Sequence, residues 1–180
     1  MHRTYLGLGT NLGNRAANID RAIALLQQQV GPLVKCSSYI SSKPWGFSSD
    51  NDFLNAAAIF DTTLTPLQLL RATQAIEQQM GRTQKSQGSR VKSQGARVKS
   101  QESRGESQEA RERHYADRII DIDILLYDTL QLTSPELAIP HPLMAQRDFV
   151  VSPLAEIAPR KRHPALGKTI AQLKKELLKN

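Results

Sequence analysis

Cysteine and long apolar runs are scarce in this sequence of 180 residues. Cys36 is the only cysteine, which excludes an internal disulfide and a metal site built from cysteines. It lies in an alternating segment, and we interpret it as a small buried apolar residue. No run approaches the roughly 20 apolar residues of a membrane span, and the start, from Met1 to Tyr5, has no apolar signal-peptide region. We therefore expect a cytoplasmic protein with no membrane partner.

The size and composition fit a single domain. A chain of 180 residues with 39% hydrophobic residues can bury one continuous core, so we expect one domain over residues 1–180. The formal net charge of +7 invites a nucleic-acid-binding interpretation. However, residues 84–112 hold seven Lys or Arg against four Asp or Glu, so +4 lies in the rest of the chain. This mild excess is compatible with a nucleotide substrate.

Residues 85–112 form a tandem repeat of heptads: KSQGSRV, KSQGARV, KSQESRG and ESQEARE. A coiled coil needs apolar residues at two positions of each heptad, but Val91 and Val98 are the only sizeable ones here. A segment rich in Ser, Gln, Gly and mixed charge cannot bury a core. We expect a disordered insertion.

The chain before the insertion alternates between strand and helix patterns. A strand at 4–10 leads through a Gly-Asn turn to a helix whose apolar spacing begins at Ile19. Two further strands are predicted at 34–40 and 55–62, where the chain alternates or is apolar and extended.

A second helix is predicted to begin at Thr65, a good N-cap before proline, and to end at Gly81. After the insertion, the run RIIDIDILLYD predicts a central strand, followed by a short return strand at 130–132. The order β-α-β-β-α-β predicts a ferredoxin-like α+β sandwich, with an antiparallel sheet covered on one face by two helices. A Pro-rich loop and an amphipathic helix from Lys168 complete the chain.

Asp121-Ile122-Asp123 is the most informative point of the sequence. Alternation along a strand directs both carboxylates to one face, about 7 Å apart. Two carboxylates in an apolar strand repel each other, and a divalent cation removes that repulsion. Mg²⁺ usually takes one or two carboxylates together with substrate phosphates, so the pair indicates phosphoryl transfer. The alternative is a strand edge whose acidic face meets solvent or pairs with Arg118.

His141 lies between two prolines, and Arg147 follows shortly before the aromatic Phe149. A rigid loop that offers an imidazole and a guanidinium can bind phosphate oxygens with little loss of entropy. The alternatives are a structural loop histidine and a surface ion-pair former. Phe53 and Asn55 in DNDFLNAA are equally open, since an aromatic residue usually lies in the core and an Asn in a turn.

Four motifs together resemble the family of 6-hydroxymethyl-7,8-dihydropterin pyrophosphokinases. They are YLGLGTNLGN, PWG followed by DFLN, RIIDIDILLY, and IPHPLMAQRDFVVSPLAEIAP, in matching order and spacing over nearly the whole chain outside the insertion. The resemblance implies a monomeric enzyme of folate biosynthesis. Such an enzyme transfers pyrophosphate from ATP to the hydroxymethyl group of 6-hydroxymethyl-7,8-dihydropterin and releases AMP, with two Mg²⁺ ions as cofactors.

The resemblance also implies roles for individual residues. The implied catalytic residues are Arg82, Arg118, Asp121 and Asp123, and the two aspartates hold the Mg²⁺ ions that bridge the ATP phosphates. The implied ATP site consists of Gln74, Glu77, Arg118, Ile124, His141 and Arg147. The implied pterin site consists of Ser42, Pro44, Trp45, Gly46, Phe53, Asn55 and Phe149. In this site the ring stacks between the two phenylalanines, and Asn55 bonds its polar edge.

The sequence departs from the family pattern in one region. The family's mobile catalytic loop lies between Gly81-Arg82 and Arg118, and the heptad repeat stands inside it. Gln84 occupies a position that can carry a second arginine, and Tyr115 one that carries a tryptophan. These differences bear on loop closure rather than on the metal pair.

Two alternative functions remain open. A ferredoxin-like nucleic-acid-binding module would use the basic charge, but it predicts exposed aromatic residues on the strands. Asp121 and Asp123 on the sheet would instead repel phosphate unless a metal intervenes, so we expect no nucleic-acid partner. A catalytically impaired relative would use its long loop for an interaction.

Overall fold

The computed structural model describes residues 1–46, 49–81 and 117–179. The heptad repeat, Arg82, Gln84 and Tyr115 lie outside this part of the chain. The elements are β1 (His2–Thr10), α1 (Arg15–Gln29), β2 (Leu33–Cys36), β3 (Ile40–Ser42), β4 (Phe53–Thr62), α2 (Pro66–Gln79), β5 (Asp121–Tyr127), β6 (Leu132–Thr133), β7 (Ala138–Ile139), the 3-10 turn η1 (Met144–Gln146), α3 (Asp148–Ile157) and α4 (Ile170–Leu177). None of the described helices has both the length and the apolar content to cross a membrane.

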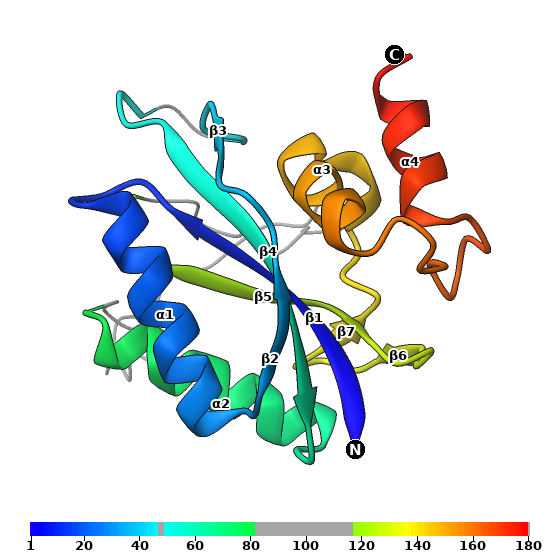
Figure 1. Ribbon diagram of the computed structural model, residues 1–180, viewed down its shortest axis with the longest axis horizontal. Helices are drawn as coiled ribbons and strands as arrows, with labels where there is room; N and C mark the ends of the chain where they lie inside the picture. The colour runs from blue at the N-terminus through cyan, green and yellow to red at the C-terminus, as the bar shows by residue number, and fades with distance from the viewer. Residues whose placement is uncertain (47–48, 82–116, 180) are drawn as a thin grey trace, which may run out of the picture.

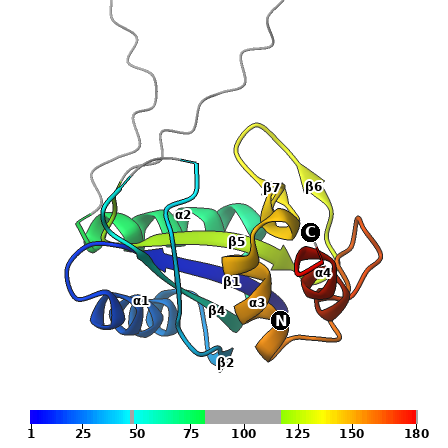
Figure 2. The ribbon, with the colours of Figure 1, turned by 90° about the horizontal axis from the view of Figure 1, so that it is seen from above.

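Five strands form one antiparallel sheet in the order β2-β4-β1-β5, with β3 also paired to β4. The predicted ferredoxin-like α+β arrangement is confirmed. The strands that precede the two helices, β1 and β4, lie side by side in the middle of the sheet, and β2 and β5 lie at its edges. The predicted return strand is displaced to Leu132–Thr133. It pairs with β7 in a separate two-stranded sheet that stands apart from the main sheet (Figure 2).

The interpretation of RIIDIDILLYD as a central strand is wrong, because β5 lies at one end of the sheet order. Its apolar composition reflects burial on both faces instead. Ile122 and Ile124 belong to the core beneath α1 and α2, whereas Leu125 and Leu126 belong to the core beneath α3 and α4. The sequence pattern reports burial of the side chains and carries no information about the number of neighbouring strands.

Two hydrophobic cores lie on opposite faces of the sheet. Alternation in β1 sends Leu6 and Leu8 to the core with α1 and α2, and Tyr5 to the core with α3 and α4. Figure 1 shows these two helix pairs on opposite sides of the sheet. The predicted covering of one face by two helices is confirmed, and the second face is covered by helices of the C-terminal region.

The helix α3 was not expected, since its residues fall in the segment predicted as a Pro-rich loop. Pro153 lies inside it and removes one backbone donor. Val151, Leu154 and Ile157 recur at helical spacing and are all buried in the core that includes β4 and β5. Burial of this apolar stripe outweighs the missing hydrogen bond.

Thr65 begins α2 as predicted. Its side chain accepts a hydrogen bond from the backbone N–H of Gln68, whose side chain accepts one from the backbone N–H of Thr65. We expect Thr65→Ala to lower the free energy of unfolding by about 1 kcal/mol, because this capping box loses its hydroxyl. Chemical denaturation measures the change, and Thr65→Ser is the matched control that keeps the hydroxyl. Equal stability of the Ala and Ser variants would contradict the prediction.

Candidate active site

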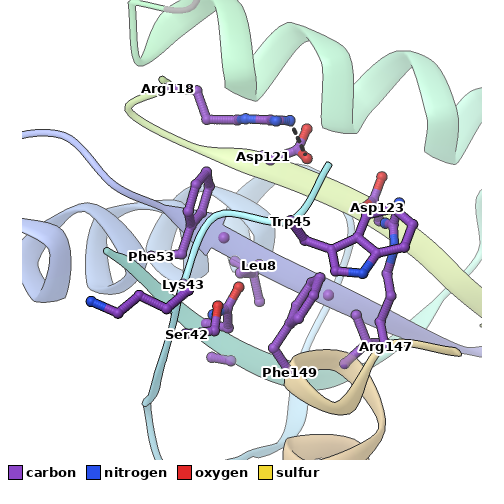
Figure 3. A pocket seen from close by; sticks show the side chains of 15 residues that line it. Leu8, Ser42, Lys43, Trp45, Phe53, Arg118, Asp121, Asp123, Arg147 and Phe149 are labelled. Atoms are coloured by element: carbon purple, nitrogen blue, oxygen red, sulfur yellow. Dashed lines mark hydrogen bonds and ion pairs between the residues drawn. The ribbon is translucent and has the colours of Figure 1, made fainter. Parts of the chain in front are cut away.

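A cleft opens on the face of the sheet that carries α3, and its floor is formed by β1. Gly7 and Gly9 of β1 are paired directly with Asp123 and Asp121 of β5. Since paired residues share a face, the two carboxylates stand beside two positions without side chains. Neighbouring side chains occupy the space above both glycines, because a Cβ would meet Leu125 at 3.4 Å over Gly7 and Asn55 Oδ1 at 3.3 Å over Gly9. Figure 3 shows Asp121 and Asp123 in this cleft.

The lining of this cleft comes from five segments that are distant in the sequence, including strands, loops and the start of α3. It consists of Gly7, Leu8, Gly9, Ser42, Lys43, Trp45, Phe53, Asn55, Ala56, Arg118, Asp121, Asp123, Arg147, Phe149 and Val150. Carboxylates, guanidinium groups and aromatic rings therefore share one cavity.

The two aspartates meet on one face, and Arg118 joins them. An Arg118 Nη1 atom lies 2.6 Å from Asp121 Oδ2, and the two side chains are 11% and 18% exposed. This ion pair was the alternative to a metal site at the sequence level, and the structure contains it. Because it engages Asp121 while Asp123 also lines the cleft, the pair with Arg118 does not exclude a cation between the carboxylates.

The donor set fits magnesium. Within the described residues, no group of three or more His, Cys, Asp or Glu side chains could hold a metal. Zinc prefers such a set of three or four nitrogen, sulfur or carboxylate ligands. Mg²⁺ instead takes one or two carboxylates and fills its octahedron with water and phosphate oxygens. Asp121 and Asp123 thus suit Mg²⁺ bound together with a phosphate-bearing substrate.

Arg118 is held in place from its backbone. Its N–H donates to Asn11 Oδ1 at 2.8 Å, and its carbonyl accepts from the Asn11 N–H at 3.2 Å. Its guanidinium lies 5.7 Å from the centre of the Phe53 ring. Asp117 precedes Arg118 in the chain, and its carboxyl has a pKa below the usual value. The main cause is a hydrogen bond from Ser49, followed by one from Asn11. The loops that border the cleft are therefore fastened to one another around Arg118.

The aromatic side of the cleft surrounds a second guanidinium. The Arg147 guanidinium lies 4.3 Å from the centre of the Trp45 ring and 5.9 Å from that of Phe149, within the range of cation–π attraction. Arg147 is buried, whereas Trp45 is 40% exposed. Figure 3 shows Phe53 and Phe149 on either side of the cleft.

Asn55 lies on the floor between these rings. It is paired with Gly9 across the sheet, is buried, and donates from Nδ2 to Ser42 Oγ at 2.9 Å. This contact joins β4 to the end of β3, just before the loop that carries Trp45. A buried amide fixed in this way can recognise a polar edge of a bound molecule.

Several residues of the implied ATP site lie elsewhere. Gln74 is exposed on α2, and the buried Glu77 accepts a hydrogen bond from the Ile122 backbone. The side chain of Ile124 is in the core on the opposite face from the aspartates. His141 is buried after a cis proline bond, and its Nδ1 accepts from the Leu143 N–H at 3.2 Å.

Two residues of the implied pterin site are near the cleft without lining it. Pro44 and Gly46 flank Trp45 in the loop after β3. Sequence reasoning missed the glycine floor, although alternation in Leu6-Gly7-Leu8-Gly9 could have revealed two empty positions on the polar face. It also missed Leu8, Ala56 and Val150.

This combination of an α+β sandwich with paired carboxylates, guanidinium groups and aromatic rings in one cleft suits Mg²⁺-dependent phosphoryl transfer to a flat substrate. The family model for 7,8-dihydro-6-hydroxymethylpterin-pyrophosphokinase (HPPK) matches residues 5–98 and 92–159. The two matches overlap inside the heptad repeat. The chain belongs to the HPPK family.

Relatives with curated names agree with this membership. A 2-amino-4-hydroxy-6-hydroxymethyldihydropteridine pyrophosphokinase of Porphyromonas gingivalis is 42% identical over 86% of this chain and 90% of its own length. Proteins of the same name from Methylorubrum extorquens and Aquifex aeolicus are 37% and 33% identical. They are matched over 88% and 98% of this chain, and over 84% and 92% of their own lengths.

Solved structures share the fold. An HPPK-DHPS crystallised with substrates superposes with a TM-score of 0.70 at 12% identity, over 99% of this chain and 43% of that one. A Plasmodium falciparum HPPK-DHPS gives 0.69 at 16% identity, over 99% and 46%. This chain therefore spans less than half of either protein, and the likeness concerns the fold alone.

Proposed function

We propose that this chain transfers a pyrophosphoryl group from ATP to the hydroxymethyl group of 6-hydroxymethyl-7,8-dihydropterin, in folate biosynthesis. The observation that carries the proposal is the meeting of the Asp121–Asp123 pair with Phe53 and Phe149 in one cleft. A phosphate-binding end and a ring-stacking end are what the two substrates require. The relatives named above support the same reaction.

The acidic end of the cleft is assigned to ATP. Asp121 and Asp123 hold two Mg²⁺ ions, and Arg118 and Arg147 add positive charge near the phosphates. Bound Mg²⁺ neutralises phosphate charge and orients the phosphate chain. The assignments of Arg82, and of Gln74, Glu77, Ile124 and His141, rest on the family resemblance.

The aromatic end is assigned to the pterin. A flat heterocycle stacks between Phe53 and Phe149, and Asn55 bonds its polar edge while Ser42 and Trp45 border it, with Pro44 and Gly46 in the same loop. Gly9 beneath it allows a close approach to the backbone of β1.

The reaction needs positioning more than covalent participation of the protein. The pterin hydroxymethyl oxygen forms a bond to the β-phosphorus of ATP, the bond from that phosphorus to the α-phosphate bridging oxygen breaks, and AMP leaves. The hydroxyl proton passes to solvent, and we assign no side chain as a general base. Arg118, held by Asn11 and beside Asp121, stabilises charge that develops on the transferred group.

The test is a steady-state assay of AMP release from ATP with the dihydropterin. Turnover that requires both the pterin and Mg²⁺ supports the proposal. No turnover in a folded, ATP-binding protein favours a catalytically impaired relative.

The strands do not support the nucleic-acid-binding alternative, which requires exposed aromatic side chains. The aromatic residues of the strands are all 9% exposed or less: Tyr5, Phe53, Phe60 and Tyr127. We also propose that the protein is a monomer in the cytoplasm, which sedimentation and cell fractionation test.

Gly9→Ala tests the floor of the pterin site. The added Cβ would stand 3.3 Å from Asn55 Oδ1 and 3.8 Å from a ring carbon of Phe53. We expect the dissociation constant for the pterin to rise about tenfold, because overpacking of this kind costs about 1–3 kcal/mol. ATP affinity, measured in the same calorimetric series, is the internal control and should stay within about threefold. A variant that binds the pterin as tightly as the wild type would contradict the assignment.

A further inference from the structure

Glu77 joins α2 to the strand that carries the acidic pair. It is 6% exposed, and its Oε1 accepts a hydrogen bond of 2.8 Å from the backbone N–H of Ile122. That N–H lies between Asp121 and Asp123. The contact therefore fixes the backbone between the two residues that carry the carboxylates.

The position of β5 makes this contact important. The strand ends the sheet order, so β1 is its neighbour on one side and α2 reaches it from the other. An edge strand offers backbone groups that no further strand pairs. Two like charges at alternate positions also repel each other. The strand needs an anchor at Ile122 to keep the carboxylates in a fixed geometry.

The residue type at position 77 supports such a role. Ile76 and Met80, also on the buried part of α2, are apolar and serve packing. A buried carboxylate is unfavourable unless hydrogen bonds offset its loss of hydration. An acceptor at this place therefore serves the Ile122 N–H rather than the hydrophobic core.

We propose that Glu77 is a positioning residue that sets the Mg²⁺ affinity of Asp121 and Asp123 by fixing the backbone of β5 at Ile122. This inference rests on the proposed function, which assigns the pair to Mg²⁺. In this role Glu77 acts through the strand, and a direct contact with ATP is the alternative that the experiment separates. Its carboxylate would hold the backbone geometry in which both aspartates point into the same cleft, where they would bind Mg²⁺.

The experiment measures binding of Mn²⁺ alone by electron paramagnetic resonance in the full chain. Glu77→Leu keeps the volume but has no acceptor, and its dissociation constant for Mn²⁺ should rise about tenfold, as when partners that orient metal ligands are lost. The Ile122 amide should also exchange with deuterium faster. In turnover, the Leu variant should recover as Mg²⁺ is raised. Glu77→Gln keeps an acceptor oxygen, so its dissociation constant for Mn²⁺ and the exchange rate of its Ile122 amide should stay within about twofold of the wild type.

Leu69→Ala is the matched control, since Leu69 is fully buried on the same helix and its loss destabilises the fold. It should bind Mn²⁺ like the wild type. Unchanged Mn²⁺ affinity in Glu77→Leu would overturn the inference while leaving the proposed function intact. An equal rise of the KM for ATP in the Gln and Leu variants at saturating Mg²⁺ would also overturn it, in favour of a direct charge contact with the nucleotide. A wild-type chain that binds no Mn²⁺ would overturn the proposed metal pair together with this inference.

Discussion

Replacement of Asp123 by Asn is expected to lower Mg²⁺-dependent turnover by at least about 100-fold, because a neutral amide cannot hold the cation that neutralises the ATP phosphates. Asp121→Asn should lower turnover to a similar extent. Both carboxylates line the same cleft on one face of β5. Steady-state AMP release at saturating ATP and pterin measures the effect, and activity within a few-fold of the wild type would refute it.

The two variants should differ in stability, although their activities fall together. Asp121 pairs with Arg118 at 2.6 Å, so Asp121→Asn loses a charge-assisted hydrogen bond worth roughly 1–3 kcal/mol. Asp123→Asn leaves the Arg118–Asp121 pair intact and relieves the like-charge repulsion between the two aspartates. Asp61→Asn is the matched control, because this strand carboxylate pairs with Arg3 outside the cleft. It should keep full turnover.

Phe149→Ala is expected to raise the dissociation constant for the pterin by about 10–100-fold, since stacking of a ring on an aromatic side chain is worth about 1–3 kcal/mol. ATP affinity should change by less than about threefold. The reason is that Arg147, which is assigned to the ATP phosphates, lies 4.3 Å from the Trp45 ring and keeps that neighbour when Phe149 is lost. Calorimetry with the pterin, and separately with a non-hydrolysable ATP analogue and Mg²⁺, gives both constants.

The control for this stacking prediction is Phe149→Tyr, which keeps a ring of the same shape. It should bind the pterin within a few-fold of the wild type. Phe53→Ala should resemble Phe149→Ala if the ring lies between the two side chains. Equal losses of pterin and ATP affinity in Phe149→Ala would reject the assignment of this residue to the pterin site.

Local patterns were enough to predict much of the fold. The period of apolar residues located α1, α2 and α4, and the Thr65-Pro66 pair located the start of α2. The alternation rule placed Asp121 and Asp123 on one face, where the structure has them. These features depend on residues that are close in the sequence, and backbone geometry fixes their relation.

Other features depend on which segments pack together, and the sequence alone could not supply them. The helix α3 forms around Pro153 because the core beneath it buries an apolar stripe, a gain that composition does not reveal. The edge position of β5 follows from the pairing of β1 with β4 and β5, which is a long-range choice.

The sequence by itself determined the kinds of chemical group available to this protein and their local spacing: an acidic pair on one strand, two arginines, and aromatic residues beside an asparagine. The tertiary structure decided which of them meet. Antiparallel register set Gly9 beside Asp121 and Gly7 beside Asp123, and the packing of α2 against β5 brought Glu77 to the Ile122 backbone. The physical reason is that local periodicity fixes only the face to which a side chain points, whereas strand order and helix packing fix its neighbours.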